Sequence, residues 1–253
     1  MKIKALILNT FKEAVRGKIF LVILGFSIVL LVGTKVLIPL SLGEERKIIM
    51  DIGLGSISIV GILLAILIGS QLVYHELEKK TVYFILSKPV KRSTFIVGKF
   101  FGLSLTLLVV VIMLTAWFYI VLFWLTRLHP FSLLTAILLS YFEIVLVTAF
   151  SIFFSTFTSP TVASVFTFFF FVIGRLAPDI HLLASNVKEP VTHFFLSFMY
   201  YIIPNLSNFN VRGKVVYGEP IAGDRIIFSI AYALIYTIIF LLISCEIFSR
   251  KDL

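Results

Sequence analysis

Six long apolar stretches constrain the fold of this chain more than any other feature of its sequence. A helix needs roughly 20 apolar residues to cross a bilayer core of about 30 Å, and strands of a membrane barrel would instead alternate in polarity. Because backbone polar groups must be paired within lipid, the stretches predict an all-α integral membrane protein, a bundle of six transmembrane helices. The stretches are residues 19–40, 52–73, 100–125, 131–154, 161–177 and 226–248.

The composition excludes other classes of protein. Apolar residues make up 60% of the 253 residues and charged residues 14%, against roughly 45–50% and about 25% in soluble domains. A soluble core of this size could not bury so much apolar surface, and disordered chains are poor in apolar residues. With Cys245 as its one cysteine, the chain is no disulfide scaffold.

The net charge of +9 is distributed as a membrane topology requires. Thirteen basic residues lie in the N-terminal arm, the 74–99 connection and the C-terminal tail, whereas the short connections of the other side hold only Arg46, Lys47 and Arg127. The positive-inside rule therefore predicts a multi-pass protein of the cell (inner, cytoplasmic) membrane with both termini cytoplasmic. In a soluble protein this charge would suggest nucleic acid; here we expect lipid and no nucleic-acid partner.

Residues 1–18 precede the predicted transmembrane domain, 19–253. Ile3, Ile7 and Phe11 recur every four residues opposite Glu13, which predicts an amphipathic helix on the cytoplasmic interface. Two interpretations stay open: a basic anchor that only sets the topology, or a surface helix that helps to hold a cytoplasmic partner.

Two connections between the predicted spans contain apolar residues that must be shielded from water. In the cytoplasmic 74–99 connection, the apolar run 82–86 precedes Pro89, which ends any helix before it. Headgroups, the bundle or another protein must cover this run. In the external 178–225 connection, residues 193–203 are apolar and aromatic but too short to cross, which predicts a re-entrant or interfacial segment. Turn-forming residues follow it up to residue 223.

The sequence lacks the motifs of the common catalytic sites. Gly98-Lys99-Phe100 lacks the preceding glycine and the following hydroxyl residue of a nucleotide-binding loop. His75-Glu76 is not followed by the second histidine of a zinc protease, and no G-x-S-x-G turn occurs. We therefore expect no catalysis, no metal site and no cofactor in this chain, which argues against an intramembrane enzyme or a haem- or quinone-binding subunit.

Two kinds of residue stand out within the apolar stretches. Glu143 lies near the middle of the fourth stretch, where a charge costs about 2.5–3.5 kcal/mol. It is either part of a translocation path or gate, or a polar contact between helices. We expect Arg175 to reach the headgroups. Small residues predict close helix packing on two faces; they are Gly61, Ala65, Gly69, Gly98 and Gly102.

The 74–102 segment resembles the ABC type-2 permeases. Its motifs are Tyr74-His75-Glu76-Leu77-Glu78-Lys79-Lys80-Thr81, then Leu86-Ser87-Lys88-Pro89-Val90-Lys91-Arg92, then Gly98-Lys99-Phe100-Phe101-Gly102. The segment looks closest to the branch that contains the permease of the nitrous-oxide reductase copper-maturation system. Lys80 departs from the glycine that many relatives have before the threonine.

The resemblance implies a six-helix half-transporter of the type-2 exporter kind. Such a chain pairs with a second permease copy, identical or paralogous, and with two ABC ATPase subunits that hold ATP and Mg²⁺. It implies export of an unidentified substrate; the alternative is a subunit that transports nothing and passes motion to an extracytoplasmic protein. The 74–99 connection would contain the coupling helix that docks on the ATPase, and 193–203 would cap the exit. The implied coupling residues are Glu76, Glu78, Thr81, Leu86, Lys88, Pro89 and Arg92.

Overall fold

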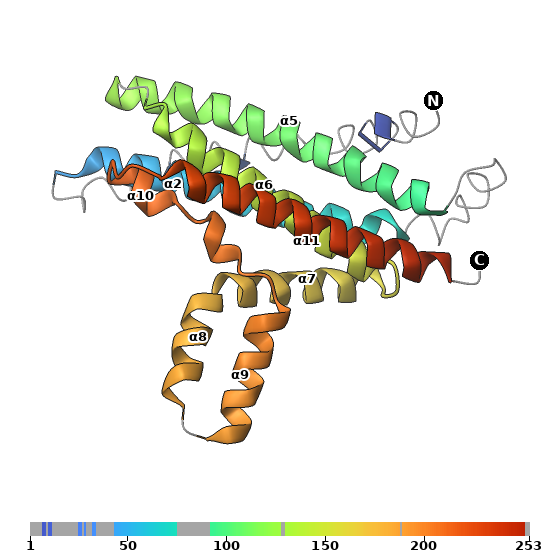
Figure 1. Ribbon diagram of the computed structural model, residues 1–253. Coiled ribbons are helices and arrows are strands. Elements are labelled where there is room, and N and C mark those ends of the chain that lie inside the picture. The colour runs from blue at the N-terminus through green and yellow to red at the C-terminus, as the bar shows by residue number, and fades with distance from the viewer. Residues whose placement is uncertain are drawn as a thin grey trace.

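The computed structural model describes residues 43–74, 92–127, 130–187 and 189–250, and a few residues before 43. Every regular element in these ranges is a helix (Figure 1). The elements are α2 (Glu45–Leu72), α5 (Arg92–Thr126), α6 (Ser132–Ser155), α7 (Pro160–Arg175), α8 (Ala177–Asn186), α9 (Pro190–Ile202), the 3-10 helix η2 (Leu206–Phe209), α10 (Arg212–Val216) and α11 (Gly223–Ser249). Most of the predicted first span and most of the predicted 1–18 helix lie outside the described residues.

Four of these helices are long and apolar enough to cross a membrane: α2, α5, α6 and α11, with 28, 35, 24 and 27 residues. They confirm four of the predicted apolar spans. Three of them begin earlier than predicted, α2 at Glu45, α5 at Arg92 and α11 at Gly223. A helix satisfies its own backbone in water as well as in lipid, so it can continue past the apolar stretch.

The predicted fifth span is divided by a bend. The 16-residue α7 ends at Arg175, and α8 leaves it at an angle of 63°. Pro178 cannot donate a backbone hydrogen bond to the preceding turn, which favours the break. The described residues therefore contain four spans, or five if the bent pair crosses as one, and the prediction of six spans is not confirmed.

Helices α8 and α9 form a hairpin that stands off the bundle (Figure 1). The ring of His181 on α8 stacks on Tyr200 of α9, with 4.6 Å between their centroids. The predicted apolar segment 193–203 forms most of α9, and none of the thirteen residues of α9 is buried. After it, the structure has η2 and α10 where the sequence predicted turns alone.

The core of the bundle is built where α2 meets α5 and α6. A Cβ on Gly53 would overlap the buried ring of Phe118, and one on Gly61 would overlap Ile144. One on Gly69 would lie 2.7 Å from Oγ of Ser151. Lipid offers helices no hydrophobic drive to associate, so contacts that small residues permit carry much of the packing energy.

The other predicted small residues also lie in tight places. Ala65 of α2 is fully buried. Gly98 is buried in α5, and a Cβ on Gly102 would lie 2.6 Å from Cβ of Thr10. Polar contacts reinforce the α2–α6 seam, because the Ser151 hydroxyl donates to the backbone carbonyl of Ile66 at 3.1 Å. In lipid such a bond between helices contributes roughly 0.6 kcal/mol.

The Gly53–Phe118 contact predicts a destabilising substitution. Gly53→Ala should lower the free energy of unfolding by about 1–3 kcal/mol, because the buried ring has no space to move. The matched control is Gly223→Ala on α11, where the new methyl group meets no described atom within 4 Å. Thermal unfolding in detergent measures both variants. Equal transition midpoints would contradict the packing role of Gly53.

Candidate functional site

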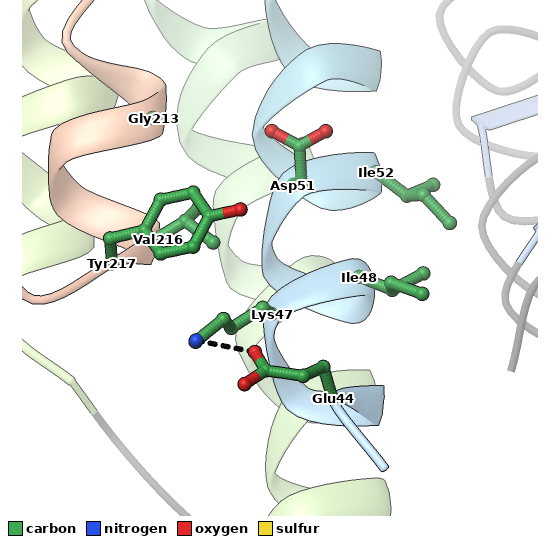
Figure 2. A pocket seen from close by; sticks show the side chains of 8 residues that line it. All are labelled: Glu44, Lys47, Ile48, Asp51, Ile52, Gly213, Val216 and Tyr217. Atoms are coloured by element: carbon green, nitrogen blue, oxygen red, sulfur yellow. Dashed lines mark ion pairs between the residues drawn. The ribbon is translucent and has the colours of Figure 1, made fainter. Parts of the chain in front are cut away.

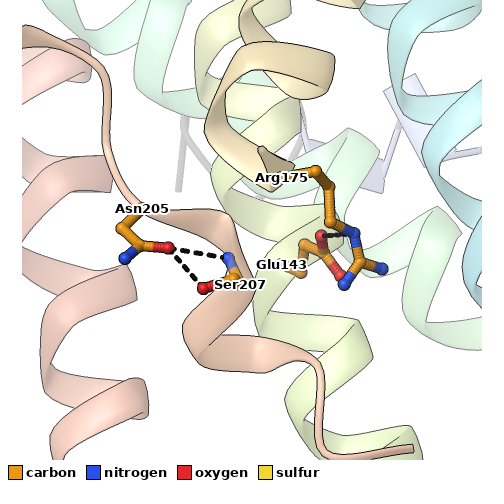
Figure 3. A network of polar contacts seen from close by, with 4 residues as sticks. All are labelled: Glu143, Arg175, Asn205 and Ser207. Atoms are coloured by element: carbon orange, nitrogen blue, oxygen red, sulfur yellow. Dashed lines mark hydrogen bonds and ion pairs between the residues drawn. The ribbon is translucent and has the colours of Figure 1, made fainter. Parts of the chain in front are cut away.

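A buried ion pair lies at the centre of the bundle. Glu143 of α6 is 1% exposed, and its Oε1 lies 3.2 Å from Nε of Arg175, the last residue of α7 (Figure 3). The prediction that Arg175 reaches the headgroups is wrong, since its side chain turns inward and is 26% exposed. The buried carboxylate attracts the guanidinium because an unpaired charge inside a membrane helix is costly.

The end of α7 is held by the chain that returns from the hairpin. A Cβ on Gly174 would lie 2.8 Å from the carbonyl oxygen of Pro204, so the two segments are in close contact. The backbone N–H of Asn205 donates to the Tyr232 hydroxyl of α11 at 2.8 Å. The side chain of Asn205 accepts hydrogen bonds from the N–H and hydroxyl of Ser207, in the first turn of η2 (Figure 3). This arrangement fixes the position of Arg175.

A second ion pair attaches α10 to α2. Nε of Arg212 lies 2.8 Å from Oδ1 of Asp51, and both side chains are partly exposed. The guanidinium lies against Gly55, which has no side chain to displace it. The connection between the hairpin and α11 is therefore joined to α2 by charge and to α7 by packing.

An open pocket of about 610 Å³ lies between the start of α2 and α10 (Figure 2). Lys47 pairs with Glu44 there, and its ammonium lies 4.8 Å from the ring centroid of Tyr217. Asp51 also lines this pocket. Among the described residues, no group of three or more histidine, cysteine, aspartate or glutamate side chains comes together to hold a metal ion.

The opposite end of the bundle carries the ends of the 75–91 connection. Arg92, the first residue of α5, donates from Nη1 to the carbonyl oxygen of Ser249 on α11 at 2.9 Å. The ring of Phe95 stacks on that of Phe248, with centroids 5.6 Å apart. We call the apolar cluster around this stack the base cluster: Val73, Phe95, Ile96, Phe100, Val145, Ala149, Ile152 and Phe248.

Of the predicted coupling residues, Arg92 lies within the described part of the chain. Its contact with Ser249 ties the start of α5 to the end of α11. The others lie outside the described residues: Glu76, Glu78, Thr81, Leu86, Lys88 and Pro89.

Comparison with known proteins decides the family. The model of the ABC-2 family transporter proteins matches residues 5–253. The chain belongs to the ABC-2 family. It is a multi-pass transmembrane permease of an ABC transporter, and its partners are the membrane and an ABC ATPase. A comparison with curated proteins found no match.

Sequence reasoning missed several polar contacts of this permease. The partner of Glu143 could have been found, because a carboxylate in the middle of one span requires a cation from another, and Arg175 ends the next apolar stretch. The pair between Asp51 and Arg212 gave no such signal. These residues are 161 positions apart, and both lie in segments that we read as polar connections or helix ends.

Glu143 is more deeply buried than Arg175, so substitutions of these two residues should lower the stability by different amounts. Arg175→Met leaves a fully buried carboxylate without its cation and should cost about 3–5 kcal/mol of stability. Glu143→Gln should cost less, because the partly exposed guanidinium can turn toward water. Thermal unfolding of the purified permease measures both, with Arg250→Met as an exposed ion-pair control of little effect.

The double variant Glu143→Gln/Arg175→Met completes this test. It should be more stable than the sum of the two single losses predicts, because neither charge is left alone. Additive losses would contradict the pairing.

Proposed function

We propose that the permease is one half of an exporter. Two copies, identical or paralogous, would form the transmembrane part, and two separate ATPase subunits would bind ATP and Mg²⁺ and hydrolyse the nucleotide. The observation that carries the proposal is the family match over residues 5–253 in a chain whose sequence has no nucleotide-binding loop of its own. Both termini and the 74–99 connection would face the cytoplasm, as the positive-inside rule predicts.

The coupling to the ATPase would pass through the ends of the 74–99 connection. Val73 at the end of α2 and Phe95 near the start of α5 belong to the base cluster, together with Phe248 of α11. Close-packed side chains transmit a displacement to their neighbours. Movement of the docked connection would therefore shift α2, α5, α6 and α11 together. The proposed coupling residues in the connection are Glu76, Glu78, Thr81, Leu86, Lys88, Pro89 and Arg92.

Charge reversal in the connection should weaken ATPase binding. We expect Lys88→Glu/Arg92→Glu to reduce association of the ATPase roughly tenfold, because charges at the rim of an interface orient and hold the partner. Co-purification followed by titration of the ATPase onto the immobilised permease measures the change. The control is Arg250→Glu, which reverses an exposed charge near the same end of the bundle. Undiminished association of the double variant would contradict the coupling assignment.

A second function has one observation in its favour. The α8–α9 hairpin stands off the bundle and exposes large apolar residues, among them Phe194 and Tyr201, which are 70% and 76% exposed. Such a hairpin offers a contact for an extracytoplasmic protein that receives motion, as in a subunit that transports nothing. Capping of an export path, which the family resemblance implies for 193–203, is the use that we favour.

One reconstitution separates the two functions. The permease is co-purified with its native ATPase and placed in proteoliposomes, where ATP hydrolysis and substrate flux are followed across substrate classes. An exporter should hydrolyse ATP faster with its substrate and move that substrate; a complex with a catalytically inactive ATPase is the control. The resemblance of 74–102 to the copper-maturation branch places copper- and sulfur-containing species in the screen, beside lipids, hydrophobic peptides and drugs. Hydrolysis that no class stimulates, with no flux, would contradict export.

A further inference from the structure

A small, partly open cavity is lined by one residue of each ion pair. Its volume is about 20 Å³, and it is lined by α2, α6, the end of α7 and the segment that joins η2 to α10. The polar residues of its wall are Ser58, Ser140, Arg175, Asn210 and Arg212. Arg175 belongs to the central ion pair with Glu143 and Arg212 to the pair with Asp51, so the guanidinium-bearing residue of each pair lines this cavity.

Two polar atoms in the wall of this cavity lack partners. Oγ of Ser58 and Nη1 of Arg175 are buried and have no hydrogen-bond partner among the described residues. Ser58 itself is 6% exposed. A buried polar group without a partner carries its full desolvation penalty, and native structures satisfy such groups with protein or with ordered water.

The size and lining of the cavity select its occupant. A site needs roughly 10–15 Å³ in the same measure to hold one water molecule, together with two to four polar partners. This cavity meets both conditions, and it is too small for phosphate or an organic solute.

We propose that one ordered water occupies this cavity and joins the two ion pairs into a single polar network. It would accept from Nη1 of Arg175 and from the guanidinium of Arg212, and donate to the Ser58 hydroxyl, with the η2–α10 segment forming one wall of the site. The network would hold this segment on α2, α6 and α7 as one unit. This inference does not depend on the proposed export function, because it concerns the bundle alone.

Two serines of equal burial test the water site. Ser58 and Ser104 are both 6% exposed, and both hydroxyls lack a hydrogen-bond partner among the described residues, but Ser104 does not line this cavity. Ser58→Ala should lower the unfolding midpoint of the full-length permease by about 2–4 °C, because a hydrogen bond to water is lost. Ser104→Ala should leave the midpoint unchanged or raise it. The proposal is overturned if Ser58→Ala behaves like Ser104→Ala.

A substitution that fills the cavity should change the unfolding midpoint in opposite directions, depending on whether the cavity holds a water molecule or is empty. Ser58→Val adds apolar volume, which stabilises a protein when it fills a dry hole but destabilises it when it expels a bonded water. We expect a midpoint below that of Ser58→Ala. A midpoint above that of the unmodified permease would show a dry cavity and overturn the proposal.

The joining of the two ion pairs is tested by a double-mutant cycle. Asp51→Asn and Glu143→Gln lie in different pairs, so without a connection their effects on stability should add. We expect a non-additive result in the unmodified permease and an additive one in the Ser58→Val background. Additive effects in both backgrounds would overturn the network, even if the water itself were present.

Discussion

The fold of this permease depends on the placement of one carboxylate inside a helical bundle. Glu143 is 1% exposed on α6, the helix that contacts α2, α5, α7 and α11. A charge at this depth requires a cation, and α7 supplies it by ending at Arg175. The chain then bends into α8 and returns so that Pro204 covers Gly174 at the end of α7. The neutralisation of one charge, the length of α7 and the route of the following connection are therefore linked.

The small residues of α2 allow it to pack closely against α5 and α6. Gly53, Gly61 and Gly69 lie about two helical turns apart and face α5 and α6. There, Phe118, Ile144 and Ser151 occupy the space that side chains would fill. Gly55 gives room to Arg212 in the same way, so one helix accommodates both the apolar seam and the second ion pair. A helix with a bulky side chain at these positions could not approach its neighbours closely enough to form either contact.

The apolar spans could be predicted from the sequence because bilayer thickness alone fixes their length. Bilayer thickness does not predict bends or short helices whose positions depend on contacts with distant parts of the chain. The bend after Arg175 arises where a cation, a buried carboxylate and Pro178 act together. From the sequence alone, an arginine near the end of the apolar stretch 161–177 is equally consistent with a residue that reaches the membrane surface. Helix α10 is five residues long, and an ion pair with Asp51 of α2 holds it in place. The helix propensity of so short a segment is therefore too weak to predict it from the sequence. A systematic search for the counter-ion of Glu143 would have recovered the central pair, and the family resemblance was the source of the coupling residues.

The continuity of α6 connects the two ends of the molecule. Val145 and Ile152 of α6 belong to the base cluster, and Glu143 lies two residues before Val145 on the same uninterrupted helix. Nine residues of helix span roughly 13 Å, so a displacement at Ile152 reaches Glu143 through a rigid element. Helix α7 begins after the break at 156–159, so Arg175 lies on a different helix from Glu143. Under the proposed function, movement of the 74–99 connection would change the position of Glu143 relative to Arg175, and through Arg175 the attachment of the η2–α10 segment. The central ion pair is thus placed where motion from the ATPase side would be converted into a change at the opposite end.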